Sequence, residues 1–415
     1  MPRIGFAFNQ KPESPAIARP EDETPTGDDE PPSRRRDAVA SRNSDAPAPS
    51  ELARSATVGG NSAAPAHADD EFAEWDSADT IDAVAAALAP LGDVIRLEAN
   101  ADFPRALQDA RPDIVFNIAE GLRGVNREAH VPAICEFFGI PYSGSDPFTL
   151  SLCLDKVRTK EVLAYHRVPT AAFTVAHGNG ERGMGNGERG LLAASSMQPR
   201  FPVPASPFPV FVKPVHEGSS KGITEANFCR DDDELHAQVE FLLERYRQPV
   251  LIEEYLPGAE FTCAVLGNGD DARVLPIVGM NFEALPEGAL PVYGFEAKWI
   301  WDRPEKPLEI FECPARITEE LRCAIELVVL RAYRVLGCRD WSRIDVRLDA
   351  AGKPNVVEVN PLPGILPNPA DNSCFPKAAR AAGMSYDELI QACLLFAAER
   401  QGIELDVAAS AAAWQ

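Results

Sequence analysis

The residues of this chain best suited to chemistry are two acids, an amide and a guanidinium near its C-terminal end: Arg343, Asp345, Glu358 and Asn360. They lie in two runs, Trp341–Asp349 and Asn355–Asn360, that alternate with period two around a turn-forming segment, so the sequence predicts a β-hairpin. With the turn centred on Ala351-Gly352, Asp345 lies opposite Glu358 and Arg343 opposite Asn360. Because residues two apart share a face of a strand, the four polar groups are expected on one side of the sheet.

This predicted face could bind a metal ion beside an anion. Asp345, Glu358 and Asn360 offer the hard oxygen ligands that Mg²⁺ (or Mn²⁺) prefers, with phosphate oxygens completing the coordination. Arg343 suits a carboxylate or a developing oxyanion. The alternative is a solvated hairpin face with a cross-strand ion pair, which the following Pro361-Leu-Pro-Gly364 argues against.

Two further segments have compositions suited to a nucleotide. In the first, a strand ending at Lys213 opens into a Gly/Ser-rich loop whose backbone N–H groups could bind phosphate, and it lacks the Walker spacing. In the second, strand-like runs flank an acidic turn that could contact adenine and ribose. The candidate residues of the two segments are Lys213, Glu217, Gly218, Ser219, Ser220, Glu253, Glu254, Tyr255, Leu256 and Glu260. Taken alone, the loop could be a plain turn and the acidic turn could be merely solvated.

Apolar periodicity predicts the elements that position these residues. Short strands over Ile4–Phe8, Asp93–Leu97 and Asp113–Asn117 alternate with helical stretches, one of which begins at Ser77, as expected of a parallel sheet. Further on, the sequence predicts a strand and three long helices: Val210–Pro214, Asp232–Tyr246, Thr318–Leu336 and Ser385–Arg400. The predicted fold class is therefore α/β, of the multi-domain α+β kind.

Composition shifts divide the chain into expected parts. The Pro-, Ala- and acid-rich residues 11–70 are predicted to be a disordered insert, residues 177–206 a loop insertion and 404–415 a tail. Between them we expect a first strand in 1–10, an N-terminal α/β domain in 71–150, a small central α+β domain in 151–250 and a C-terminal α+β domain in 251–403.

Overall charge and cysteine content narrow the class of protein. With 415 residues and a formal net charge of −23, the chain would repel nucleic acid and anionic membrane, so neither is expected as a partner. Its nine cysteines form no CxxC pair and are expected to be reduced thiols. The sequence shows neither a signal peptide nor an uncharged apolar run of membrane-spanning length, so we expect a cytoplasmic protein. His130, His166 and His216 have no evident carboxylate partner in the sequence and are interpreted as structural or solvated rather than catalytic.

In order and approximate spacing, these segments resemble the ATP-grasp superfamily and specifically the D-alanine–D-alanine ligases. The resemblance covers residues 71–176 and 207–400. It is carried by Ile140-Pro-Tyr-Ser-Gly-Ser145, Leu154-Asp-Lys156-Val-Arg-Thr-Lys160, Val212-Lys-Pro214, Glu217-Gly-Ser-Ser220, Glu260-Phe-Thr262, Glu296-Ala-Lys298, Arg343-Ile-Asp345-Val346 and Glu358-Val-Asn360-Pro361.

The resemblance implies three domains around an ATP-binding cleft and a ligation that passes through an acylphosphate. It further implies phosphate contacts for Lys156, Lys213 and Lys298, adenine and ribose contacts for Glu253 and Glu260, and two Mg²⁺ ions on Asp345, Glu358 and Asn360. Arg343 and the backbone N–H of Gly364 would stabilise the oxyanion, and Ser219 or Ser220 with Ser373 would orient small amino-acid substrates. Relatives are commonly homodimers, so a homodimer is possible.

The segments that depart from the family pattern are those that the resemblance assigns to binding of the amino-acid substrates. The family's Gly-Gly-x-Ser-x-Glu loop is missing after the first strand, and Glu74 could replace its glutamate, which binds the first substrate's ammonium. Glu120 stands where the family has histidine, and Trp299 ends an altered lid motif. We therefore expect a peptide-bond-forming ligase that need not use D-alanine for both substrates. The alternatives are a ligase for another amino-acid or dipeptide pair and a nucleotide-binding module without catalysis.

Overall fold

The computed structural model describes residues 1–12, 72, 74–121, 123–178, 208–286, 288–294, 296–301 and 308–405. Nearly all of the predicted disordered insert (11–70), of the predicted loop insertion (177–206) and of the tail (404–415) lies outside these ranges. Within them, no helix is long and apolar enough to cross a membrane.

A three-stranded parallel sheet forms the N-terminal part, with β1 (Arg3–Phe8) between β2 (Asp93–Glu98) and β3 (Ile114–Asn117). Its strands are close to the predicted ones because each is a short apolar run. The helices that follow or precede these strands are α1 (Ala78–Leu88), α2 (Phe103–Ala110) and α3 (His130–Phe138). Ser77 caps α1 as expected, since its hydroxyl accepts a hydrogen bond from the Thr80 backbone N–H at 3.2 Å.

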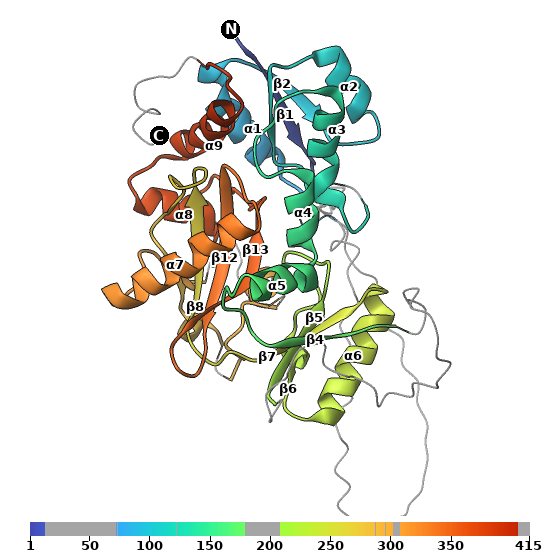
Figure 1. Ribbon diagram of the computed structural model, residues 1–415, viewed down its shortest axis with the longest axis vertical. Helices are drawn as coiled ribbons and strands as arrows, with labels where there is room; N and C mark the ends of the chain where they lie inside the picture. The colour runs from blue at the N-terminus through green and yellow to red at the C-terminus, as the bar shows by residue number, and fades with distance from the viewer. Residues whose placement is uncertain are drawn as a thin grey trace, which may run out of the picture. The chain divides into compact units, whose positions relative to one another are not determined.

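A four-stranded antiparallel sheet follows, in the order β4-β7-β5-β6. Its strands are β4 (Phe173–Ala176), β5 (Val210–Pro214), β6 (Phe228–Cys229) and β7 (Val250–Glu254). Helix α6 (Asp232–Tyr246) covers one face, visible in yellow-green in Figure 1, and buries Leu235, Val239 and Leu242 against it. The sheet extends to Glu254, a few residues beyond the boundary expected at 250, because β7 pairs with both β4 and β5.

The third sheet contains the predicted hairpin and runs in the order β11-β10-β8-β12-β13, with β9 paired to β8. Its strands are β8 (Glu260–Leu266), β9 (Arg273–Val274), β10 (Val278–Met280), β11 (Phe311–Glu312), β12 (Trp341–Leu348) and β13 (Pro354–Asn360). Helix α7 (Glu319–Val335) buries Ile325, Val329 and Tyr333 against this sheet. Helix α8 (Cys374–Ala381) packs on β8 and β10.

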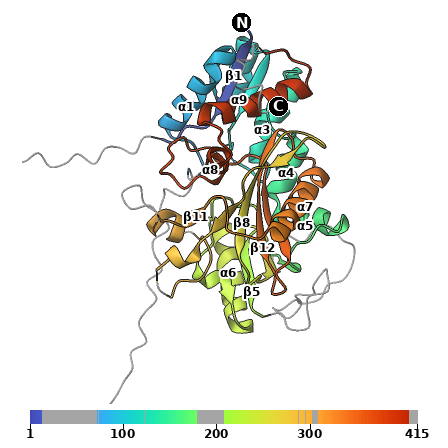
Figure 2. The same ribbon diagram turned by 90° about the vertical axis from the view of Figure 1, so that its left-hand side faces the viewer.

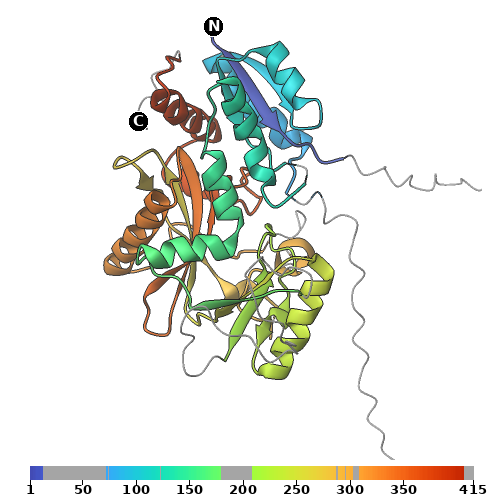
Figure 3. The ribbon, with the colours of Figure 1, turned by 45° about the vertical axis from the view of Figure 1, so that its right-hand side comes forward.

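Helices α4 (Pro147–Leu154) and α5 (Lys156–Tyr165) lead from the N-terminal sheet towards β4, and Figure 3 shows this run in teal and green. Helix α9 (Tyr386–Arg400) returns to the N-terminal part and lies beside α1, as Figure 2 shows. The Gln391 side chain on α9 donates a hydrogen bond to the Ala87 carbonyl at 2.8 Å. The shorter helical segments are η2 (Ala89–Leu91), η3 (Arg127–Ala129), η4 (Glu225–Asn227), η5 (Phe282–Ala284) and the π-helical η6 (Glu296–Trp301).

Aromatic packing joins the N-terminal sheet to the C-terminal sheet. The fully buried Trp341 on β12 lies 5.8 Å from Phe116 on β3 and 5.6 Å from Phe375 on α8, ring centroid to ring centroid. The same core contains residues of β1, α1, β8, β12, α8 and α9. Burial of this many apolar side chains fixes β12, and therefore the polar hairpin residues, relative to β3.

The hairpin register is the predicted one at the polar residues. Arg343 pairs with Asn360 and Asp345 with Glu358. Beyond Asp345 the pairing shifts by one residue, because Val357 is an extra residue on β13, and Val346 pairs with Val356. The turn is therefore centred slightly earlier than Ala351-Gly352.

Candidate active site

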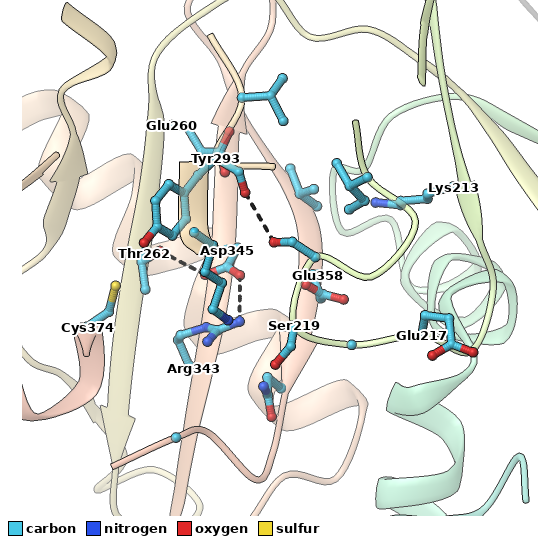
Figure 4. A pocket seen from close by; sticks show the side chains of 18 of the residues that line it. Lys213, Glu217, Ser219, Glu260, Thr262, Tyr293, Arg343, Asp345, Glu358 and Cys374 are labelled. Atoms are coloured by element: carbon cyan, nitrogen blue, oxygen red, sulfur yellow. Dashed lines mark hydrogen bonds and ion pairs between the residues drawn. The ribbon is translucent and has the colours of Figure 1, made fainter. Parts of the chain in front are cut away.

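All of the predicted site residues line one pocket of about 380 Å³. They come from the segment before α1, the start of α5, β5 with the phosphate loop that follows it (Glu217–Ser220), the acidic turn, the hairpin, η6 and the loop before α8. They are Glu74, Lys156, Lys213, Glu217, Gly218, Ser219, Ser220, Glu253, Glu254, Tyr255, Leu256, Glu260, Lys298, Arg343, Asp345, Glu358, Asn360, Gly364 and Ser373. Figure 4 shows the hairpin residues facing Ser219, with Lys213 and Glu217 at the other side of the view.

The carboxylates of Asp345 and Glu358 come from paired positions of the hairpin, and each has few hydrogen-bonding or ion-pairing partners. Asp345 accepts a hydrogen bond from the Thr262 hydroxyl at 2.9 Å and forms an ion pair with Arg343 at 3.1 Å. Burial raises the pKa of Asp345, and the nearby charge of Glu358 adds to this effect although Arg343 opposes it. A cation placed between the two carboxylates would relieve this repulsion, so the residues fit a divalent metal ion with Asn360 as a third oxygen ligand.

Lys156, the first residue of α5, connects this hairpin to the phosphate loop. Its ammonium group lies 2.8 Å from a Glu358 carboxylate oxygen and donates a hydrogen bond to the Glu217 carbonyl at 2.6 Å. Burial alone would raise the pKa of Glu358, but Lys156 and then Lys213 and Arg343 lower it to about 2. Glu358 is therefore an anion in the folded protein at neutral pH.

Glu253 lines the pocket, and its carboxylate forms ion pairs with two lysines. Its carboxylate pairs with Lys213 on β5 at 2.7 Å and with Lys160 on α5 at 2.8 Å. Burial would raise its pKa, yet the two lysines lower it to about 2. The carboxylate thus holds Lys213 in place, while the neighbouring Glu254, Tyr255 and Leu256 line the pocket.

The loop after Lys213 contains two consecutive serines in the left-handed backbone region, which is strained for this residue type. Ser219 and Ser220 both adopt positive φ, 50° and 61°, and the Ser220 hydroxyl donates to the Tyr293 carbonyl at 3.1 Å. A Cβ on Gly218 would lie 2.2 Å from a Glu74 carboxylate oxygen, so a larger residue there would displace the Glu74 side chain. The loop is thereby packed directly on Glu74.

Glu74 lines the pocket, but its carboxylate already has two cationic partners. Arg127 donates to both of its oxygens at 3.0 and 3.1 Å, and Lys221 lies 3.3 Å away. Burial would raise the pKa of Glu74, and these two cations lower it below its usual range. The geometry therefore gives Glu74 a role in fixing the loop, which sequence reasoning did not anticipate.

Near the end of the pocket, Ser373 accepts a hydrogen bond from the Leu366 N–H at 3.2 Å and donates to the Gly364 carbonyl at 3.2 Å. Lys298 lies on η6, where burial and then the charge of Arg343 lower its pKa to about 8. The side chain of Trp299, the altered lid residue, lies outside the described part of the structure.

The structure adds residues that sequence reasoning missed. Arg347 on β12 pairs with Glu260 at 2.7 Å, donates to the Tyr255 hydroxyl at 2.9 Å and stacks over the Tyr255 ring at 4.9 Å. The alternation that selected Arg343 and Asp345 continues to Arg347, so the signal was present in the sequence. His216 has a carboxylate partner after all, since its Nε2 lies 3.5 Å from Asp155.

Known proteins with similar sequences include D-alanine–D-alanine ligases. The family model described as D-ala D-ala ligase C-terminus matches residues 200–395. The D-alanine–D-alanine ligase of Bordetella pertussis is 36% identical over 263 residues, which cover 63% of this chain and 72% of the relative. The uncharacterized protein y4sG of Sinorhizobium fredii is 35% identical over 282 residues, covering 68% and 73%.

Solved structures agree on the fold. The D-alanine–D-alanine ligase from Bacillus anthracis complexed with ATP superposes with a TM-score of 0.56 at 23% identity, covering 79% of this chain and 96% of that one. A second structure of the B. anthracis ligase gives a TM-score of 0.58 at 24% identity. The predicted multi-domain α+β fold class is thus confirmed. With this sequence identity over most of a relative's length, and with the same fold, the chain belongs to the D-alanine–D-alanine ligase family.

Proposed function

We propose that this protein is a Mg-ATP-dependent ligase that joins the carboxyl group of one amino acid to the amine of another. A carboxylate oxygen attacks the γ-phosphorus of ATP, the bond to the bridging oxygen breaks, and ADP leaves. The amine nitrogen then attacks the acyl carbon of the acylphosphate, phosphate leaves and the nitrogen loses a proton. The observation that carries this proposal is the shared pocket, where Arg343, Asp345 and Glu358 face Lys213 and the loop at Ser219.

Phosphoryl transfer needs charge neutralisation and alignment more than covalent help, and the pocket is built from groups of that kind. Lys156, Lys213 and Lys298 would contact phosphate oxygens, and Ser219 and Ser220 present their loop backbone to them. Asp345, Glu358 and Asn360 would hold Mg²⁺, which neutralises phosphate charge when bound. Arg343, buried beside the hairpin carboxylates, would stabilise the oxyanion together with the backbone N–H of Gly364.

For the nucleotide base, the segment Glu254, Tyr255 and Leu256 supplies the pocket wall. Glu260 would accept hydrogen bonds from the ribose hydroxyls, with Arg347 holding its carboxylate at 2.7 Å. Glu253 would act through Lys213 rather than through adenine, because its two oxygens already face lysines.

The amino-acid pair most in keeping with the family is D-alanine with D-alanine, in peptidoglycan precursor synthesis. A different pair, amino acid or dipeptide, is the second candidate, and Glu120 in the pocket favours it. A nucleotide-binding module without catalysis would have no need to retain Arg343 beside the intact metal ligands. Use of ATP fits a cytoplasmic setting, and a homodimer is part of the proposal by analogy with relatives.

The test is Mg-dependent phosphate release from ATP with D- and L-amino acids, singly and in pairs, with products identified by mass. Asp345→Asn and Glu358→Gln should each lower turnover by more than about a hundredfold while the fold persists, because the Mg²⁺ ion would lose an anionic ligand. The control is Asp270→Asn on an exposed loop. Full activity in either hairpin variant would contradict the metal assignment, and ATP binding without release for any pair would favour the binding module.

A further inference from the structure

The pocket has an end that the nucleotide chemistry does not use. It is lined by Lys11, Glu74, Trp75, Asp76 and Glu120, at the carboxyl ends of β1 and β3. Ligands of open parallel sheets bind at this edge. Because the loop at Gly218 contacts Glu74, this end adjoins the proposed phosphate site.

Charge at this end of the pocket is unbalanced. Four carboxyl groups, those of Glu74, Asp76, Glu120 and Glu128, influence one another here. The cations that oppose them are Arg127 and Lys221, both on Glu74, and Lys11, which faces Asp76. Lys156 is also nearby but pairs with Glu358 at 2.8 Å. Because two of these cations share Glu74, the described residues leave two carboxyl groups, those of Glu120 and Glu128, without an ion pair.

Of these two carboxyl groups, only that of Glu120 lines the pocket. Within the part of the chain that the structure describes, nothing forms a hydrogen bond or ion pair with its carboxylate. Burial first, and then the charges of Glu128 and Glu74, raise the pKa of Glu120 well above its usual range. Since a carboxylate buried beside like charges is costly, a ligand cation would find favourable interactions there.

The backbone holds Glu120 in a fixed position. The Gly121 N–H donates to the Asn9 side chain at 2.8 Å, and the Gly121 carbonyl accepts from the Trp75 indole at 3.3 Å. Gly121 has φ 82°, and a Cβ there would lie 2.2 Å from the Arg127 carbonyl oxygen. Such a tightly specified turn places Glu120 at the pocket as a preorganised group.

We propose that Glu120, and not Glu74, binds the ammonium group of the amino acid whose carboxyl group is phosphorylated. This inference rests on the proposed function. It makes the substrate class a free amino acid with an unmodified ammonium group, and it makes Glu74 a positioning residue for the loop at Gly218. An N-acylated amino acid or a hydroxy acid would leave the Glu120 carboxylate unpaired and should be a poor substrate.

The experiment compares substrates that differ only in the ammonium group. Wild-type protein, Glu120→Gln and Glu74→Gln are assayed for Mg-dependent phosphate release with D-alanine, D-lactate and propionate. If another amino acid of the panel gives faster release, that acid and its hydroxy and unsubstituted analogues replace these three. The KM for ATP is measured in parallel, and circular dichroism with urea unfolding reports on folding.

Glu120→Gln should raise the KM for the amino acid by about tenfold to a hundredfold, as expected for loss of a charged hydrogen bond. It should also reduce the preference over the ammonium-free analogues and leave the KM for ATP unchanged. Glu74→Gln should lower stability and weaken ATP binding but keep that preference.

An unchanged KM and preference in Glu120→Gln, with active wild-type protein, overturns this inference alone. If Glu74→Gln and not Glu120→Gln loses the preference for the amino acid over its ammonium-free analogues, then Glu74 is the residue that binds the ammonium group. If the wild-type protein releases no phosphate with any amino acid, the proposed function is wrong, and so is the inference that rests on it.

Discussion

Lys160 is the residue whose importance is clearest from the structure alone. It is 2% exposed, lies 2.8 Å from Glu253, donates to the Thr170 hydroxyl at 2.7 Å and stands over the Phe173 ring at 5.7 Å. It does not line the pocket, so its effect on the site passes through Glu253 to Lys213.

We expect Lys160→Met to cost about 3–5 kcal/mol of unfolding free energy, because breaking a buried ion pair leaves Glu253 with one cation fewer. Urea unfolding gives this value, with the exposed Lys353→Met as the matched control. The ATP affinity should fall as well, since Lys213 loses part of its support. Equal urea midpoints for the wild type and Lys160→Met would show that the ion pair contributes nothing to stability.

The buried carboxyl group of Glu128 should make the unfolding free energy depend on pH. Burial raises its pKa to about 7 against the opposing charge of Arg127, whereas the unfolded carboxyl group has a pKa of about 4.3. The folded state therefore holds this proton more tightly, which favours folding at low pH. That advantage is lost as the pH rises from about 4 to about 7.

Replacing Glu128 by glutamine removes the unfavourable ionisation. We expect Glu128→Gln to be more stable than the wild type at pH 8 by about 3–4 kcal/mol, with the difference shrinking towards pH 5. Urea unfolding between pH 5 and pH 8 measures it, and Glu320→Gln on the exposed face of α7 serves as the control. A difference that is constant across this range would show that the carboxyl group does not titrate there.

At the scale of elements, the phosphate loop and the segment before α1 act as one unit through Gly218 and Glu74. Gly218→Ala would place a methyl group against the Glu74 carboxylate and separate it from Arg127 and Lys221. We expect about a tenfold loss of ATP affinity, corresponding to about 1.4 kcal/mol. Gly178→Ala is the control, because its Cβ would have no neighbour closer than 4.0 Å.

A double variant separates this contact from a direct effect on phosphate. In a Glu74→Ala background the clash is absent, so Gly218→Ala should cause little further loss of ATP affinity. Calorimetric titration of ATP into the four proteins gives the coupling. Additive losses would instead mean that the methyl group disturbs the phosphate site itself.

At the scale of the molecule, the pocket is lined by residues of the four-stranded sheet, the third sheet and the N-terminal part. A bound nucleotide would therefore contact all three parts. ATP with Mg²⁺ at a hundredfold excess over its Kd should stabilise the fold by about 2.7 kcal/mol. Thermal unfolding with ATP, with and without Mg²⁺, tests this, and AMP is the control that lacks the outer phosphates. Asp345→Asn should lose the Mg-dependent part, whereas equal shifts with and without Mg²⁺ would contradict the metal site.

Local pattern was enough to predict much of this protein. The strand at Val210–Pro214, the helix at Asp232–Tyr246 and the capped start of α1 were predicted correctly, because apolar period and capping chemistry are local properties. Pairing of Asp345 with Glu358 followed from counting around the hairpin turn, and the structure confirms it. The fold class and the family followed from the order of the motifs.

Tertiary structure decided the partners of the charged side chains. Nothing in the spacing of Glu253 shows that Lys160 and Lys213, from two other elements, approach it, nor that Arg127 and Lys221 occupy Glu74. Such contacts depend on how α5, β5 and β7 pack, which is set by cores spread over the whole sequence. The sequence by itself therefore determined which chemistry this chain can perform, and only the fold determined which carboxylates remain open to a ligand, because ion pairing is a matter of distance in space.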